Sequence, residues 1–134
     1  RVGLSIREYF EREGEESFRD LEQSVIDELT LGEPCVLSTG GGVVLRPDNR
    51  EHLKKRTQAV YLHSAPEEVF RRLRHDQTRP LLQVADPLAR LKELYALRDP
   101  LYREIADVIV ETDERPPRMV VQEIIERLEA LPPR

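Results

Sequence analysis

The sequence predicts an α/β fold with a parallel sheet, because short apolar runs alternate with longer segments of helical periodicity. The apolar runs lie at 35–37 (CVL), 58–63 (QAVYLH) and 107–111 (DVIVE). Each run is too short for a helix and is typical of a buried strand. The chain has 134 residues, which favours a single domain, and a sheet of this kind is covered by helices on both faces in three layers.

The helices are predicted from the spacing of apolar residues and from capping residues at their ends. They are expected at about 5–14, 15–30, 47–56, 64–73, 86–97, 99–105 and 117–131. Arg98-Asp99-Pro100 is expected to interrupt the helix that begins at Asp86, since proline breaks a helix interior. The final helix is expected to carry these residues on its apolar face: Val121, Ile124, Ile125, Leu128 and Leu131.

The composition narrows the classes of function. The net charge of −5 argues against non-specific binding to nucleic acid or to an anionic membrane. No apolar run approaches the ~20 residues of a membrane span. The single cysteine, Cys35, excludes an internal disulfide, fits a reducing, cytoplasmic compartment, and is expected to be a buried, inert thiol. The first residues, RVGLSIREYF, do not resemble a signal peptide or begin with Met, so a processed, trimmed or incomplete chain is expected.

A run of three glycines organises the chain. Gly40, Gly41 and Gly42 follow the first apolar run, and Pro47 stands where the next helix would begin. Glycines let a ligand approach the backbone without Cβ atoms in the way. The turn alone leaves two readings open, a tight strand-to-helix connection or a ligand-facing loop. It is not a Walker A loop, because no Gly-Lys-Ser/Thr follows it.

Several arginines stand at breaks between elements. They are Arg19, Arg79, Arg98 and Arg115. Taken singly, each is typical of a surface ion pair, whereas several in one cleft would form a site for carboxylate or phosphate. The segment 74–86 has no clear periodicity and is expected to be a long loop of the kind used as a lid.

No metal site is predicted, because the three histidines are scattered without partners at metal-ligand spacing. They are His52, His63 and His75, and all three are expected to be structural or solvent-facing.

Taken together, the motifs resemble the shikimate kinase family, in the family's order and over essentially the whole chain. The motifs are Glu13-Gly14-Glu15 with Phe18-Arg19, Leu37-Ser38-Thr39-Gly40-Gly41-Gly42, Thr78-Arg79-Pro80-Leu81-Leu82, Arg98-Asp99-Pro100-Leu101-Tyr102, and Ala106-Asp107. The resemblance implies a P-loop fold like that of the nucleoside monophosphate kinases. It implies transfer of the γ-phosphate of ATP, with Mg²⁺, to the 3-hydroxyl of shikimate in aromatic amino-acid biosynthesis, by a cytoplasmic monomer.

The resemblance also implies roles for residues at the substrate. Arg19 and Arg98 would bind the shikimate carboxylate, and Glu22 would brace Arg19. Gly41, between Gly40 and Gly42, would lie against a ring hydroxyl. The pocket would be walled and closed by Phe10, Phe18, Pro80 and Leu81.

At the nucleotide, the resemblance implies that Arg79 reaches from the 74–86 lid to the ATP phosphates and stabilises charge in the transition state. Arg72 and Arg115 match positions near the nucleotide, although the surroundings of Arg115 are variable in the family.

The main departure from the family is an absence. The sequence contains no G-x-x-x-x-G-K-[ST] loop and no Asp-x-Asp strand end, so the strand–loop–helix–strand unit that begins the family's fold is expected to be missing. With it would go the catalytic lysine and aspartate and most Mg²⁺ ligands. We therefore expect this chain alone to be inactive and poorly stable.

Two other functions stay open at this point. One is a related kinase of a small polyol acid such as gluconate. The other is a non-catalytic remnant of the fold that binds a carboxylate or a partner protein. The glycine run, Arg19 and Arg98 favour shikimate over gluconate.

Overall fold

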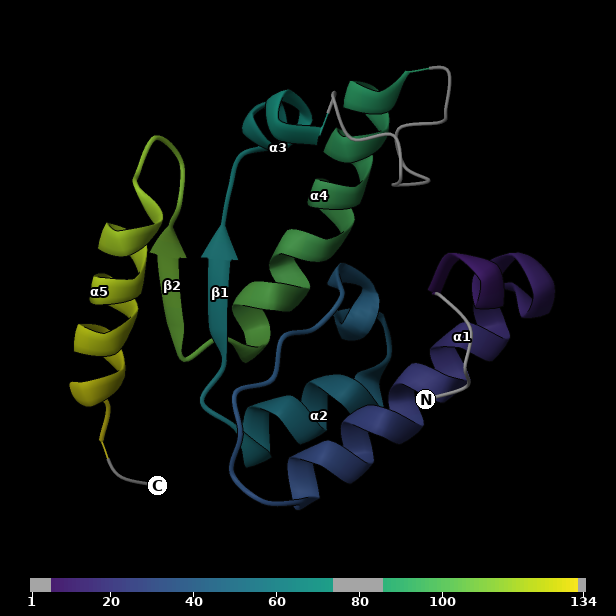
Figure 1. Ribbon diagram of the computed structural model, residues 1–134, viewed down its shortest axis with the longest axis horizontal. Coiled ribbons are helices and arrows are strands. Elements are labelled where there is room, and N and C mark those ends of the chain that lie inside the picture. The colour runs from purple at the N-terminus through teal and green to yellow at the C-terminus, as the bar shows by residue number, and fades with distance from the viewer. Residues whose placement is uncertain (1–5, 74–85, 133–134) are drawn as a thin grey trace. The chain divides into compact units, whose positions relative to one another are not determined.

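The computed structural model describes residues 6–73 and 86–132 (Figure 1). The chain divides into two compact units, residues 1–57 and residues 58–134. Within the described ranges, no helix is both long and apolar enough to cross a membrane. The single domain expected over residues 1–134 stays a prediction.

The first unit contains α1 (Ile6–Leu31), the short 3₁₀ helix η1 (Gly41–Leu45) and α2 (Pro47–Arg56). Gly14 breaks the helical conformation of α1 with φ 85° and ψ 172°, so the expected boundary between two helices near this residue is confirmed. Pro47 begins α2, as expected from its fixed φ. The buried apolar residues of this unit are Ile26, Val43, Val44 and Leu53.

The strand expected at 35–37 is wrong. Residues 34–40 have no regular secondary structure, Val36 is fully exposed at 101%, and Cys35 is exposed rather than buried. An apolar run becomes a strand only where a neighbouring strand accepts its backbone hydrogen bonds. In the described part of the chain the sheet has two strands, which pair with each other and not with this segment.

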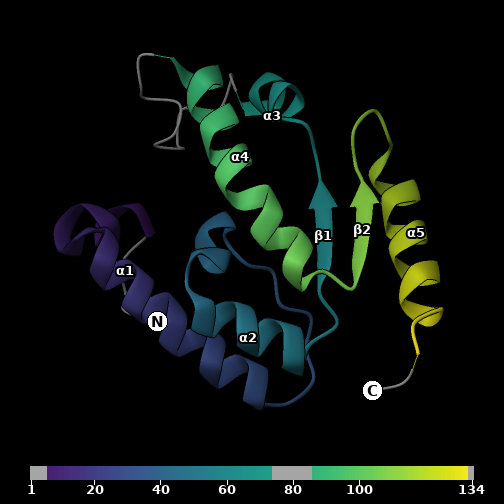
Figure 2. The ribbon, with the colours of Figure 1, turned by 180° about the vertical axis from the view of Figure 1, so that it is seen from behind.

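The second unit is built on a parallel pair of strands, β1 (Val60–His63) and β2 (Val108–Glu111), and both were expected. The connection between them carries α3 (Pro66–Leu73) and α4 (Pro87–Ile105), and α5 (Pro117–Glu129) follows β2. Figures 1 and 2 show α5 beside β2 and α4 beside β1, on opposite sides of the strand pair. Val60, Val108 and Val110 pack with α5, whereas Tyr61 and His63 bond to α4, so the two helices cover opposite faces. This is the helix–sheet–helix layering predicted for a three-layer α/β fold.

One face of the sheet packs against α5. Val108 and Val110 of β2 are buried together with Val120 of α5. The residues packed around them are Val60, Ile124, Leu128 and Leu131. The expected apolar face of this helix is therefore confirmed at Ile124, Leu128 and Leu131 and wrong at Val121 and Ile125, which are exposed at 53% and 46%. Positions 120, 124, 128 and 131 follow one another at helical spacing, whereas 121 and 125 lie about a quarter turn further round.

The interruption expected at Asp99-Pro100, in the helix that begins after Asp86, is also wrong. Helix α4 runs continuously through Pro100. An interior proline costs the helix about 3 kcal/mol or more. Buried Leu91 and Ile105 anchor α4 on both sides of the proline and offset this cost. The expected start is confirmed: the Asp86 side chain accepts a hydrogen bond from the Ala89 N–H at 3.1 Å.

Candidate functional site

In the first unit, Arg19 and Glu22 form a close ion pair on α1. Arg19 Nη1 donates to Glu22 Oε1 at 2.8 Å, and the two side chains are only 13% and 12% exposed. The pairing expected between these residues is therefore present. Arg19 Nε lies 3.6 Å from Glu15 Oε2 and has no hydrogen-bond partner among the described residues. A shielded guanidinium with an unused N–H suits recognition of an anion.

The glycine run lies directly against this pair. A Cβ atom at Gly42, which is buried, would stand 2.3 Å from Arg19 Nη2 and 2.4 Å from Cζ. A Cβ atom at Gly40 would meet Glu22 Oε2 at an ordinary 3.7 Å. Only glycine at position 42 leaves room for the guanidinium. The motif at 40–42 and the arginine at 19 therefore form one constellation within this unit.

The turn is also held by two neighbouring residues of α2. Asn49 is 1% exposed, and its Nδ2 donates to the Val43 carbonyl at 3.0 Å. Arg50 Nη1 donates to the Val44 carbonyl at 2.7 Å. The sequence reasoning missed both residues. No local signal singles out Asn49, because it stands in the first turn of α2, where asparagine is an ordinary residue.

The aromatic residues expected to wall the pocket lie on α1. The Phe18 ring is half-buried, with its centroid 5.2 Å from Arg19 Cζ and 6.4 Å from the Tyr9 ring. A cation over an aromatic face gains about 0.5–1 kcal/mol at an exposed site. Phe18 therefore helps to hold the guanidinium of Arg19. Phe10 lies on the same helix, but its side chain is outside the described residues.

In the second unit, Arg98 lies on α4 and is partly buried. Its Nε is buried and has no hydrogen-bond partner among the described residues. A buried donor without a partner is costly, typically about 1–3 kcal/mol. An anion bound at this guanidinium would remove that cost.

Next to Arg98, the Asp99 carboxylate is held by two donors. Tyr61 Oη donates to Asp99 Oδ1 at 2.7 Å, and Arg103 Nε donates to Oδ2 at 2.9 Å. Burial by itself would raise the pKa of Asp99, but these hydrogen bonds outweigh burial and hold the pKa below its usual value. Burial, followed by the hydrogen bond to Asp99, strongly raises the pKa of Tyr61. The pair is therefore ionised carboxylate and neutral phenol at neutral pH.

Two arginines expected near the nucleotide also lie in the second unit. Arg72 is exposed, with Nε 3.3 Å from Glu68 Oε1 and Nη2 donating to the Thr112 carbonyl at 3.3 Å. Arg115 Nη1 lies 2.6 Å from Glu123 Oε1.

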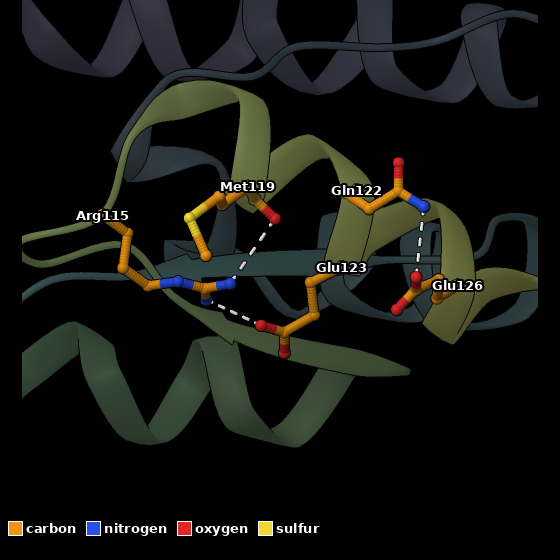
Figure 3. Close-up of a pocket in the computed structure, with 5 residues that line it drawn as sticks. All are labelled: Arg115, Met119, Gln122, Glu123 and Glu126. Atoms are coloured by element: carbon orange, nitrogen blue, oxygen red, sulfur yellow. Dashed lines mark hydrogen bonds and ion pairs between the residues drawn. The ribbon is translucent and has the colours of Figure 1, made fainter.

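The pocket beside Arg115 has a volume of about 400 Å³. It is lined by Arg115, Met119, Gln122, Glu123 and Glu126 (Figure 3). Arg115 also donates to the Glu111 and Met119 carbonyls, so its guanidinium joins the end of β2 to the start of α5. A nucleotide phosphate at Arg115 would compete with these groups and with two nearby carboxylates.

Three expected site residues lie outside the described residues. They are Arg79, Pro80 and Leu81, which belong to the expected lid at 74–86. Of that lid, only Asp86 is described, as the N-cap of α4.

The described residues contain no group of three His, Cys, Asp or Glu side chains that could hold a metal ion.

The comparisons with known proteins agree on one family. The shikimate kinase family profile matches residues 1–129. The chain is 54% identical over 134 residues to the shikimate kinase of Pseudomonas syringae pv. tomato, covering 100% of this chain and 78% of that protein. It is likewise 54% identical over 134 residues to the shikimate kinase of Pseudomonas aeruginosa, with the same coverage of 100% and 78%.

Solved structures give the same result. Shikimate kinase from Acinetobacter baumannii, in complex with shikimate, matches with a TM-score of 0.90 and 42% identity, over 96% of this chain and 72% of that one. Shikimate kinase from Aquifex aeolicus matches with a TM-score of 0.79 and 38% identity, over 95% and 73% of the two chains. The fold class expected from the sequence is therefore confirmed, and the chain belongs to the shikimate kinase family.

Proposed function

We propose that this chain supplies the shikimate-binding residues of an ATP:shikimate 3-phosphotransferase. Shikimate kinases transfer the γ-phosphoryl group of ATP to the 3-hydroxyl of shikimate, with Mg²⁺, and release ADP. The bond from the γ-phosphorus to the β–γ bridging oxygen breaks, a bond from the 3-oxygen forms, and the hydroxyl proton leaves. The observation that carries the proposal is the close approach of Arg19 to Gly42 in a chain of this family.

The carboxylate of shikimate is proposed to bind Arg19 and Arg98. Each guanidinium has a buried Nε with no hydrogen-bond partner in the described part of the chain. Charge-assisted bonds from arginine to a carboxylate are roughly twice as strong as neutral ones and are often bidentate. The backbone of Gly40–Gly42 and the rings of Phe10 and Phe18 are proposed to contact the rest of the substrate, with Pro80 and Leu81 closing over it.

For the nucleotide, Arg79 is proposed to stabilise the charge that develops on the transferring phosphoryl group. Arg72 and Arg115 are proposed to lie near bound ATP. Arg72 is exposed, and in the described part of the chain its one ion-pair partner is Glu68, so it can turn towards a phosphate at little cost. Binding of a phosphate by Arg115 requires that it first leave Glu123.

We further propose that the protein acts in the cytoplasm as a monomer, without nucleic-acid or membrane partners. The net charge of −5 and the single cysteine support this part of the proposal.

The proposal is tested by isothermal titration calorimetry with shikimate and gluconate. In a coupled ADP-release assay with ATP and Mg²⁺, this chain alone is expected to show no activity. Shikimate should bind and gluconate should not. Arg98→Ala should weaken shikimate binding about 10- to 100-fold, as expected for loss of a charged hydrogen-bonding group. Arg90→Ala is the matched control on α4, because Arg90 is exposed and its only ion pair among the described residues is a 3.4 Å surface pair with Glu93. Equal binding of the two acids, or no effect of Arg98→Ala, would contradict the proposal.

A further inference from the structure

The face of β1 opposite α5 carries two polar aromatic residues that both bond to α4. His63 Nε2 lies 2.6 Å from Tyr95 Oη, and Tyr61 Oη donates to Asp99 at 2.7 Å. Tyr61 and His63 are two residues apart on the strand, so their side chains share this face. Tyr95 and Asp99 are four residues apart on the helix, so theirs also share a face. Two hydrogen bonds therefore join the strand to one turn of α4.

The histidine is fixed from its other side by an acid. His63 Nδ1 lies 2.6 Å from Glu111 Oε2, and Glu111 is the cross-strand neighbour of His63 in the parallel register. A carboxylate only accepts, so the Nδ1 position carries the proton. In the neutral ring Nε2 is then the acceptor for the Tyr95 hydroxyl. The Tyr61 and His63 rings pack edge to face, with centroids 5.6 Å apart.

These bonds act on the part of α4 that carries Arg98. At about 100° per residue, Tyr95 and Asp99 lie within about 40° of each other, and Arg98 lies about 60° from Tyr95. The two bonds thus fix the rotation of the helix at this turn. A rotation of about 10° would move an atom 6 Å from the helix axis by roughly 1 Å. A misplacement of that size in a binding group can change a rate or an affinity severalfold to about 100-fold.

We propose that His63, Glu111 and Tyr95 are positioning residues that, with the Tyr61–Asp99 bond, hold Arg98 in the direction from which it binds a carboxylate. This inference rests on the proposed function, in which that carboxylate belongs to shikimate. The buried Nε of Arg98 supports it, because the guanidinium has no hydrogen-bond partner at Nε in the described residues that would hold it in place. Its direction is set by the helix that carries it.

The test begins with Tyr95→Phe, which removes only the hydroxyl. We expect the Kd for shikimate to rise about three- to tenfold, as for loss of one hydrogen bond, with the number of binding sites unchanged. His63→Gln keeps an amide that can reach the Tyr95 hydroxyl and should stay closer to the wild-type Kd than His63→Leu. Leu97→Ala, a control at a 60% exposed position beside Arg98, should bind as the wild type does.

A purely structural role for the network predicts a different result. Fewer binding sites at an unchanged Kd in Tyr95→Phe would mean that the bond only stabilises the fold, and it would overturn the inference. Equal Kd values for His63→Gln and His63→Leu would overturn the part played by the histidine.

A readout independent of shikimate separates this inference from the proposed function. Hydrogen exchange of the Arg98 Nε–H, followed by NMR, should become faster in Tyr95→Phe and stay unchanged in Leu97→Ala. Faster exchange in a protein that does not bind shikimate would support the positioning and contradict the proposed function. Unchanged exchange, in a protein that does bind shikimate, would overturn the positioning alone.

Discussion

Replacing Gly42 by alanine tests the central contact of the candidate site. The new methyl group would stand 2.3 Å from Arg19 Nη2, whereas ordinary van der Waals contact begins near 3.4 Å. The guanidinium must therefore move by about 1 Å or more. It is the far end of a flexible side chain, so it can move without unfolding the unit. The ion pair from Arg19 to Glu22 at 2.8 Å is lost or lengthened as a result.

This change should affect both stability and binding. The free energy of unfolding should fall by about 1–3 kcal/mol, because the shielded ion pair of Arg19 with Glu22 is weakened, and the reduced freedom of the unfolded chain offsets only part of this loss. Binding should also weaken, because a hydrogen bond from a charged group to the substrate contributes about 1.5–3 kcal/mol. That range corresponds to a rise of roughly 10- to 150-fold in the Kd for shikimate.

Titration calorimetry with shikimate, together with urea unfolding of the same samples, measures both effects. Gly32→Ala is the matched control, because a Cβ atom there meets the Glu28 carbonyl at an ordinary 3.6 Å. The control should bind shikimate as the wild type does. If Gly42→Ala bound shikimate within about twofold of the wild type while remaining folded, the closeness of Arg19 to Gly42 would have no part in substrate binding.

Three further predictions concern stability. Val110 is fully buried against α5, so Val110→Ala should lower the free energy of unfolding by about 2 kcal/mol, whereas Val121→Ala at an exposed position should change it by less than about 0.5 kcal/mol in the same urea titrations. Gly14 has φ 85° and no atom within 4 Å of an added Cβ, so Gly14→Ala tests backbone strain alone and should destabilise by about 1–3 kcal/mol or remove the kink from the helical NMR signature. The lowered pKa of Asp99 stabilises the fold fully above its unfolded pKa near 4, and this stabilisation is lost as pH falls through the folded pKa. In Asp99→Asn, the urea midpoint should therefore fall less steeply below about pH 4 than it does in the wild type. If both proteins lost stability equally below this pH, the result would count against the hydrogen bonds that lower the pKa of Asp99.

Local signals in the sequence predicted the elements that depend on local chemistry. Pro47, Gly14 and Asp86 set the ends or breaks of helices through their own backbone and side-chain properties, and all three act as expected. The strands at β1 and β2 were also predicted, because each is a short β-branched run with a partner in the same unit.

The errors arose where tertiary contacts decide the outcome. Val36 is exposed because no described strand pairs with its segment, which the residues 35–37 alone cannot reveal. Pro100 lies inside α4 because packing on both sides outweighs its local cost. The buried face of α5 was misjudged in part because Val120 and Val121 are equally apolar, and only the neighbouring strand determines which of them is buried.

The candidate site was predicted in part. The glycine run and Arg19 came from motifs, and the structure adds their direct contact. The bonds of His63 to Tyr95 and Glu111 could not be read from the sequence, because they join residues more than thirty positions apart whose approach depends on strand register.

The hydrogen bonds from Asn49 and Arg50 to the Val43 and Val44 carbonyls have a thermodynamic consequence for the glycine turn. Its backbone is ordered during folding, by side chains of the helix that follows, before any ligand arrives. The backbone amides around Gly41 are therefore already ordered when a ligand binds there, so binding costs little further conformational entropy. The glycines allow a ligand to approach the backbone closely, and the hydrogen bonds from Asn49 and Arg50 supply the rigidity that glycine itself does not provide.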